Sequence, residues 1–204
     1  MNQSATSKIL ILSPHPDDGI LGMAGSIARF REEGAEVKYV IFSWQGQGFN
    51  KEEIKNSLKI LGIDEAHTLI FNYEVRNFPY FASAIRQEMI NLREQFKPDR
   101  VFLHNSFDFH QDHKVVSEEG MRAFREGNLL GYVLPWNLRE FRFDSFISLE
   151  KKHLELKLKA LKSLISQQFR FYYAPKRIEA WAIASGLFRR KEYAEAFENL
   201  SLIL

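Results

Sequence analysis

The segment from Ile9 to Arg29, ILILSPHPDDGILGMAGSIAR, constrains the fold of this chain more than any other stretch. Its first four residues, Ile9–Leu12, are apolar β-formers, and the small and apolar residues at 20–30 favour a helix. Between them stand Pro14 and Pro16, which lack a backbone N–H and push the preceding residue away from helical geometry. The segment therefore predicts a buried strand, a short rigid turn and a helix.

The turn carries one imidazole and two carboxylates within four residues, His15, Asp17 and Asp18. Ligands of open α/β sheets bind outside the carboxyl ends of the strands, which is where this turn lies. Unpaired charge is costly in such a partly buried place, so the cluster calls for a compensating partner such as a metal cation.

A second cluster, His110-Gln111-Asp112-His113, follows a predicted strand at 100–104. In a parallel sheet both strands end at the same edge, so the two clusters can converge on one point. We expect a divalent cation there. A catalytic zinc ion typically takes three protein ligands from His, Asp or Glu and keeps one position for water.

A purely structural role remains open for each cluster taken alone. Asp18 could cap the helix that begins near Gly19, because aspartate is a favoured N-cap residue. We assign His67, His104 and His153 to structural roles, although His104 lies close to the predicted site. The presence of both clusters at matching positions favours the metal site over the structural interpretation.

Strands and helices are predicted to alternate along the first 124 residues. This pattern indicates βαβ units, and we expect an α/β fold with a Rossmann-like, mostly parallel sheet in a single domain spanning 1–204. The predicted strands are 9–12, 36–43, 68–71 and 100–104, and the predicted helices are 19–33, 51–61, 81–96 and 113–124.

The remaining third of the chain has weaker patterns. The aromatic residues of 127–146 favour β structure that covers one sheet edge. Apolar spacing predicts a helix at 151–166, and a last helix is expected at 192–200. The Gln- and Gly-rich stretch 44–50 is expected to be a mobile loop.

Composition excludes several classes of protein. With 28 basic and 26 acidic residues the net charge is +2, which gives no large positive field, so we expect no nucleic-acid partner. The absence of cysteine excludes thiolate ligands and disulfides and fits a reducing compartment. No signal peptide or spanning segment is recognisable, and we expect a cytoplasmic protein of unknown oligomeric state.

Together, SPHPDDGILG and HQDH resemble the PIG-L/LmbE-like de-N-acetylases. These are zinc-dependent enzymes with a Rossmann-like fold that remove an acetyl group from N-acetylglucosamine-type conjugates. The resemblance extends over nearly the whole chain. It includes LKILGI at 58–63, Pro98-Asp99-Arg100-Val101, Ser166-Gln167 and AEAF at 194–197.

The resemblance implies a role for each residue of the two clusters. His15, Asp18 and His113 correspond to the metal ligands, for Zn2+ or another divalent ion such as Fe2+. Asp17 corresponds to the general base and His110 to the imidazole that stabilises the oxyanion or acts as an acid. Asp112 would orient an imidazole. The implied substrate is a small amino-sugar conjugate.

Three positions depart from the family pattern. Gly19 stands where a glutamate usually follows His-Pro-Asp-Asp, and Leu164 replaces a late histidine. The position that aligns with a substrate-binding arginine of the family is near Asn50, with Lys51 next to it. Gly19 motivates an alternative, a sugar- or nucleotide-binding protein with impaired catalysis. A metal-dependent phosphoester hydrolase is a second alternative.

Several side chains near predicted loops could contact substrate. Trp44, Phe49, Tyr73 and Trp136 could stack on a sugar ring, and Lys51 or Arg76 could meet a phosphate or carboxylate. The competing interpretation is core packing for the aromatic residues and a solvated surface charge for Lys51 and Arg76.

Overall fold

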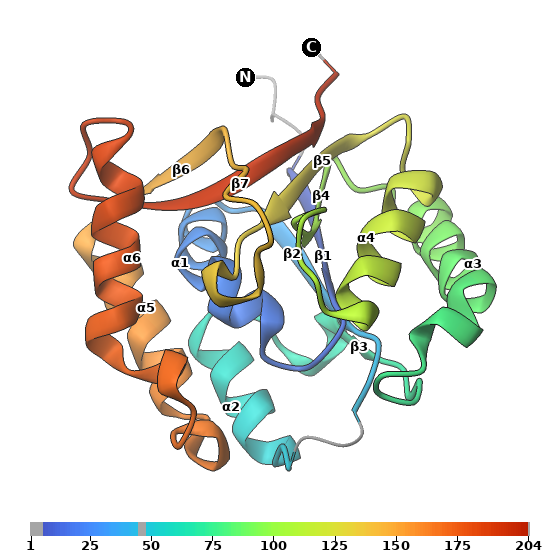
Figure 1. Cartoon of the computed structure of the whole chain (residues 1–204), viewed down its shortest axis with the longest axis horizontal. Coiled ribbons are helices and arrows are strands. Elements are labelled where there is room, and N and C mark those ends of the chain that lie inside the picture. Colours follow the sequence, from blue (N-terminus) through green and yellow to red (C-terminus); the bar gives the residue numbers. More distant parts are fainter. Residues whose placement is uncertain (1–5, 45–47, 204) are drawn as a thin grey trace.

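The computed structural model describes residues 6–44 and 48–203 of the chain. Its centre is a seven-stranded mixed sheet with the order β3-β2-β1-β4-β5-β7-β6 (Figure 1). The strands β3, β2, β1, β4 and β5 run parallel to one another, and β7 runs antiparallel to both β5 and β6. The strands are β1 Lys8–Ser13, β2 Glu36–Ile41, β3 Thr68–Ile70, β4 Arg100–His104, β5 Asn128–Tyr132, β6 Ser145–Leu149 and β7 Tyr193–Ser201.

Helices cover both faces of the sheet. One face packs against α1, α2 and α5, and the other packs against α3 and α4. We call the core between the sheet and α1, α2 and α5 the first core, and the core between the sheet and α3 and α4 the second core. β1 lies in the middle of the sheet and contributes Ile9 and Ile11 to the first core and Leu10 and Leu12 to the second, as expected for a strand buried on both faces. The longer helices are α1 Asp18–Glu32, α2 Lys51–Ile60, α3 Phe78–Phe96, α4 Gln111–Ala123, α5 Lys151–Lys162 and α6 Pro175–Leu187.

The strand order places the two predicted clusters side by side. The direction in which strands are added reverses between β1 and β4, because β2 and β3 lie on one side and β5 on the other. The loops after β1 and β4 therefore lie next to each other at a topological switch point, where open α/β sheets bind ligands. This confirms the predicted fold class and the convergence of the two loops.

The C-terminal third differs from the sequence prediction. The predicted helix at 192–200 is wrong, because residues 193–200 lie in β7. Two neighbouring strands pair with β7, and Tyr193, Glu195 and Phe197 are buried. Within 127–146, β5 is an inner strand, and the edge is formed by β6. The prediction missed α6, and residues 45–47 of the expected mobile loop lie outside the described residues.

The buried carboxylate of Glu195 holds a break in α1. Met23 has non-helical dihedrals (φ −147°, ψ 21°), so the backbone N–H groups after it lose their partners within the helix. Glu195 accepts hydrogen bonds from the N–H of Gly25 at 3.0 Å and of Ser26 at 2.6 Å, and it pairs with Lys157 Nζ at 2.6 Å. β7 thereby fixes the helix that begins at the predicted site.

Among the helices of the described residues, none has the length and apolarity that crossing a membrane requires.

Candidate active site

The turn after β1 is organised by the Asp18 carboxylate. Asp18 Oδ2 accepts the backbone N–H of His15 at 2.9 Å and lies 3.1 Å from His15 Nδ1. The residue at the N-cap of α1 is Asp17, whose side chain makes no capping hydrogen bond. The interpretation of Asp18 as a helix cap is therefore wrong.

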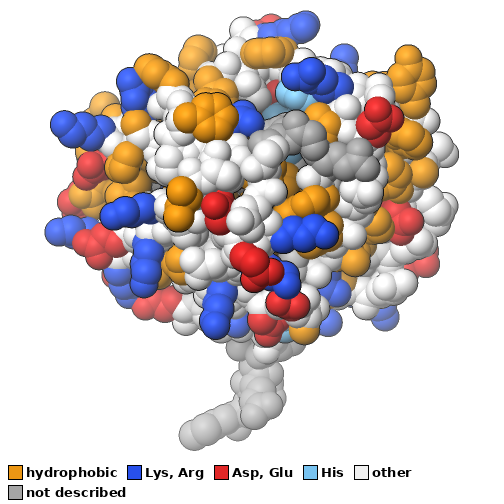
Figure 2. Space-filling view, turned by 90° about the horizontal axis from the view of Figure 1, so that it is seen from below, with side chains coloured by type: hydrophobic (Ala, Val, Ile, Leu, Met, Phe, Trp, Pro, Cys, Tyr) orange, Lys and Arg blue, Asp and Glu red, His pale blue; other side chains and the backbone are white. Residues whose placement is uncertain are grey.

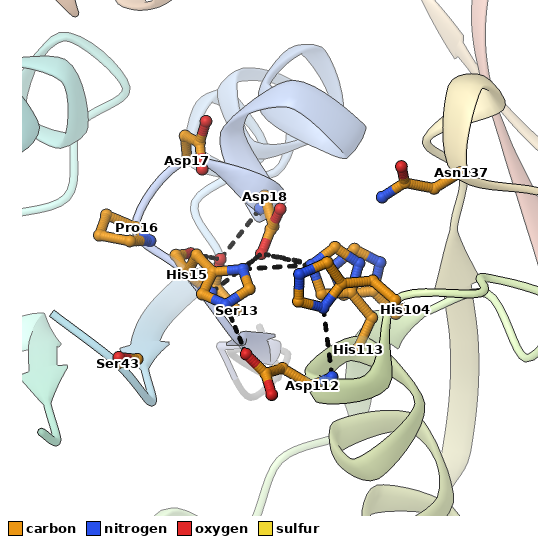
Figure 3. Close-up of polar contacts among 12 residues, drawn as sticks. Ser13, His15, Pro16, Asp17, Asp18, Ser43, His104, Asp112, His113 and Asn137 are labelled. Carbon is orange, nitrogen blue, oxygen red and sulfur yellow. Dashed lines mark hydrogen bonds and ion pairs between the residues drawn. The ribbon is translucent and has the colours of Figure 1, made fainter. Parts of the chain in front are cut away.

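Three side-chain atoms from the two loops form a nearly equilateral triangle (Figure 3). His15 Nδ1 lies 3.1 Å from Asp18 Oδ2 and 3.2 Å from His113 Nε2, and His113 Nε2 lies 3.3 Å from Asp18 Oδ2. A tetrahedral ion with ligand bonds of about 2.0–2.1 Å places its ligand atoms about 3.3 Å apart. The triangle thus has the dimensions of one face of such a coordination shell.

The other nitrogen of each imidazole is held by a carboxylate. Asp112 Oδ2 lies 3.0 Å from His15 Nε2, and Asp108 Oδ2 lies 2.9 Å from His113 Nδ1. If these nitrogens carry the protons, His15 Nδ1 and His113 Nε2 direct lone pairs toward each other and toward Asp18. Three electron-rich atoms at such distances need a cation among them, and carboxylate–histidine pairs of this kind orient metal ligands.

Protons can take the place of that cation in the metal-free protein. Burial opposes the charged imidazole, but Asp18 and hydrogen bonds to Asp112 and Asp18 raise the pKa of His15 to about 8. Burial likewise opposes protonation of His113, yet Asp18 and Asp108 raise its pKa to about 10. Burial would raise the pKa of Asp18, but the two imidazoles hold it well below its usual value. The electrostatics of the cluster therefore favour a bound cation.

His104 completes the rear wall of the cluster. It is fully buried at the end of β4, and its ring stacks on that of His113 with centroids 3.8 Å apart. Its nitrogens lie 3.6 Å from Asp18 Oδ2 and 3.3 Å from Asp108 Oδ2, and neither makes a hydrogen bond. His104, the last residue of β4, therefore packs directly against the predicted ligands.

Asp17, the predicted base, is bound from the far end of the chain. Tyr173 donates its hydroxyl to Asp17 Oδ2 at 2.5 Å, although 156 positions separate the two residues. Burial and then repulsion by Asp18 raise the pKa of Asp17 to about 6, against the lowering effect of the Tyr173 hydrogen bond. No motif marked Tyr173 in advance, because its role depends on a long-range contact.

His110 and Asp112 lie at the start of α4. The backbone N–H of Asp112 donates to His110 Nδ1 at 3.2 Å, so a neutral His110 carries its proton on Nε2. Burial and the nearby His113 and His15 lower the pKa of His110 to about 4. Asp112 Oδ2 also accepts the backbone N–H of Arg76 at 2.7 Å. Asp112 Oδ2 therefore contacts both the His15 ring and the backbone of the loop that carries Arg76.

A cavity of about 470 Å³ opens over the triangle. Seen from the carboxyl edge of the strands, imidazole surface lies beside Lys and Arg side chains (Figure 2). Of the aromatic residues expected near substrate, Trp136 lines this cavity, and its ring stacks on Tyr172 at 4.3 Å. The lining residues are His15, Asp17, Asp18, Leu21, Val75, Arg76, His110, His113, Leu134, Trp136, Asn137, Arg170 and Tyr172.

Other residues considered from the sequence lie elsewhere. Trp44 and Lys51 line a separate cavity beside α2, Phe49 packs against the first core and Tyr73 packs beside Phe71 and Phe78. The prediction missed Asp108, although its position two residues before His110 and five before His113 was a usable signal. It also missed Arg170, Tyr172 and Asn137.

Gly19 has a local structural reason. A Cβ atom at this position would lie 2.8 Å from Tyr39 Oη, 2.9 Å from Tyr39 Cε2 and 3.1 Å from Ile11 Cγ2. The Tyr39 ring fills the space beside Gly19, and its hydroxyl donates to Ser13 Oγ at 3.0 Å. Ser13 Oγ in turn accepts the Gly19 N–H, also at 3.0 Å. The missing glutamate therefore leaves no gap, and it leaves the triangle intact.

Comparison with known proteins identifies the family of the chain. Residues 10–124 match the family model PIG-L, described as GlcNAc-PI de-N-acetylase. The chain is 31% identical over 164 residues to the uncharacterized deacetylase YaiS of Escherichia coli K12, covering 76% of this chain and 88% of YaiS. It is 25% identical over 190 residues to the diacetylchitobiose deacetylase of Thermococcus kodakarensis, covering 78% and 70%.

The fold comparison gives the same picture. The crystal structure of N,N'-diacetylchitobiose deacetylase from Pyrococcus horikoshii superposes with a TM-score of 0.78 at 21% identity, covering 95% of this chain and 84% of that one. At this identity the likeness shows the fold alone. The family model and the match to YaiS show that the chain belongs to the PIG-L family of de-N-acetylases and is an amide hydrolase.

Proposed function

We propose that this protein is a zinc-dependent hydrolase that removes the N-acetyl group from an amino sugar or its conjugate. The observation that carries the proposal is the triangle of His15 Nδ1, Asp18 Oδ2 and His113 Nε2, with edges of 3.1–3.3 Å. The family and the named activities of the two sequence relatives support the acetamide as the bond that is cleaved.

His15, Asp18 and His113 would hold the metal ion. Two imidazoles and one carboxylate are a ligand set that catalytic zinc sites use, and the set fits because each imidazole is already oriented by a carboxylate. When bound, the ion acidifies water and polarises the amide carbonyl.

Asp17 would accept the proton of the attacking water. Its Oδ2 is occupied by the Tyr173 hydroxyl, and no hydrogen bond to Oδ1 is found among the described residues, so Oδ1 can take the proton. Asp17 lies in the turn between the proposed ligands His15 and Asp18, and it lines the same cavity. Once protonated, the same carboxyl group would act as the general acid and deliver that proton to the leaving amine.

His110 would stabilise the oxyanion of the tetrahedral intermediate. Because its Nδ1 accepts the Asp112 N–H, the neutral ring can donate a hydrogen bond through Nε2. A neutral donor suffices for this role, since oxyanion stabilisation depends on a donor oriented before the reaction. Asp112 would act by orienting His15 and fixing the His110 tautomer.

Acetate release from N-acetylglucosamine and N,N'-diacetylchitobiose by the zinc-loaded protein tests this function. The variant Asp17→Asn keeps the shape of the side chain but removes the base, so we expect acetate release to fall by a factor of about 10² or more. Its zinc content should match wild type. Glu126→Gln, which removes a carboxylate in an exposed pair with Arg125, is the control. Acetate release by Asp17→Asn at the wild-type rate would contradict the proposal.

A further inference from the structure

We infer that Arg76 binds an anionic group on the substrate, so that the preferred substrate is an N-acetyl amino sugar carrying a phosphate or a carboxylate. This inference rests on the proposed function and adds to it the chemical class of the conjugate. The observations that carry it are the fixed position of Arg76 at the cavity and the lack of an acidic partner for its guanidinium.

The Arg76 backbone is held in place by the site itself. Arg76 lies in the loop between β3 and α3 (Figure 1) and adopts a left-handed φ of 68°. Its N–H donates to Asp112 Oδ2 at 2.7 Å, and the N–H of Phe78 lies 3.4 Å from Asp112 Oδ1. The same carboxylate holds His15, so Arg76 is tied to a predicted metal ligand through one side chain. A non-glycine residue in this strained region often marks a functional site.

The side chain of Arg76 lines the cavity and is exposed. Among the residues that the structure describes, no carboxylate forms an ion pair with it. The residues outside the described ranges, 1–5, 45–47 and 204, carry no acidic side chain. The Arg76 charge is therefore available to a ligand.

The acidic groups around the cavity are committed to other partners. Asp17 accepts from Tyr173, and Asp18 contacts His15 and His113. Asp108 lies against His113. Arg170, the other arginine of the cavity, differs from Arg76 because Gln167 Oε1 and the Tyr172 hydroxyl hold its guanidinium at 2.8 Å each.

A free guanidinium beside a deacetylation site indicates an oxyanion on the substrate. Its planar donors match a phosphate or carboxylate in a two-point, charge-assisted contact, which lysine cannot reproduce. The acetamide must lie at the triangle for hydrolysis, so the anion bound by Arg76 belongs to another part of the conjugate. A phosphate and an acidic ether substituent share this chemistry, and the test below separates them.

The experiment compares wild type with Arg76→Asn, Arg76→Lys and Arg190→Asn. Asparagine tolerates a left-handed backbone, so Arg76→Asn removes the guanidinium without adding strain. Arg190 is an exposed arginine with φ 53° that does not line the cavity, so Arg190→Asn is matched in residue type, backbone region and charge. The probes are N-acetylglucosamine, its 1-phosphate, its 6-phosphate and N-acetylmuramic acid.

The first readout is the ratio of kcat/KM for each anionic sugar to that for N-acetylglucosamine. We expect wild type to favour at least one anionic probe, and Arg76→Asn to lower that ratio roughly ten- to hundredfold through KM. Arg76→Lys should fall between them, and Arg190→Asn should match wild type. The favoured probe identifies the anion. An equal ratio in wild type and Arg76→Asn for all three anionic probes would overturn the inference.

The second readout is calorimetric binding of the same sugars to the zinc-loaded proteins, which requires no turnover. If wild type releases no acetate from any probe, the proposed function fails, but the binding data still decide the role of Arg76. Weaker binding of an anionic sugar to Arg76→Asn alone would support the inference. Equal binding to Arg76→Asn and Arg190→Asn would overturn it.

Discussion

Replacing Gly19 by alanine tests whether Tyr39 explains the departure from the family motif. The new Cβ would lie 2.8 Å from Tyr39 Oη and 2.9 Å from Tyr39 Cε2, and the Cε2 distance is well below the optimal separation of about 3.5 Å between carbon atoms. Overpacking a rigid core costs about 1–3 kcal/mol. Because alanine gains at most about 1 kcal/mol over glycine in a helix, Gly19→Ala should destabilise the protein by about 1 kcal/mol.

The same change should have the opposite sign once the ring is removed. In a Tyr39→Val background the two contacts with the ring disappear, the 3.1 Å contact with Ile11 Cγ2 remains and the helix propensity is unchanged, so Gly19→Ala should stabilise by up to about 1 kcal/mol. The coupling free energy between the two positions is then about 1–2 kcal/mol, within the range measured for residues in contact.

Urea unfolding of the wild type, both single variants and the double variant gives this coupling directly. The single variant Tyr39→Val will itself be destabilised, since Tyr39 is fully buried, but the cycle subtracts that loss. A Gly19→Ala variant as stable as wild type, with no coupling to position 39, would refute the argument that Tyr39 requires glycine here.

Two further predictions concern the metal cluster and the support of α1. The pKa values of His15 and His113 are raised from 6.5 to about 8 and about 10, so protonation of these imidazoles stabilises the metal-free fold fully at pH values below 6.5. This stabilisation is lost as the pH rises through 8 and then through 10. Zinc must displace these protons, so calorimetry should show weaker zinc binding at pH 6 than at pH 9 and proton release at pH 7, and a pH-independent affinity would contradict this. Glu195→Gln should lower the free energy of unfolding by about 3–5 kcal/mol in urea, because it leaves Lys157 as an uncompensated buried charge, whereas the exposed Glu126→Gln should change it by less than about 0.5 kcal/mol. A Glu195→Gln variant as stable as Glu126→Gln would contradict the importance of the buried ion pair between Glu195 and Lys157.

Local sequence signals predicted the parts of the site that depend on local geometry. The prolines of the first turn and the strand before it placed His15 and Asp18 at the sheet edge, and the strand at 100–104 did the same for His113. Parallel pairing of β1 with β4 then brings the two loops together. Local pattern and one topological rule were sufficient for this.

The contacts that the sequence did not reveal join distant segments. Residues 192–200 are rich in Ala and Glu and favour a helix locally, yet pairing with β5 and β6 makes them a strand. That strand carries Glu195 to the break in α1, and the segment before α6 carries Tyr173 to Asp17. Neither partner could be chosen from spacing, because both choices depend on how the C-terminal third folds back over the sheet.

Metal analysis of the purified protein, wild type beside His113→Ala, tests the central claim most directly. The account predicts about one zinc ion per wild-type chain after incubation with zinc and removal of excess. It predicts loss of that ion in His113→Ala, which removes one vertex of the triangle. A wild-type protein that binds no divalent metal, or a His113→Ala variant that binds it as well as wild type, would contradict the metal site at the carboxyl ends of β1 and β4.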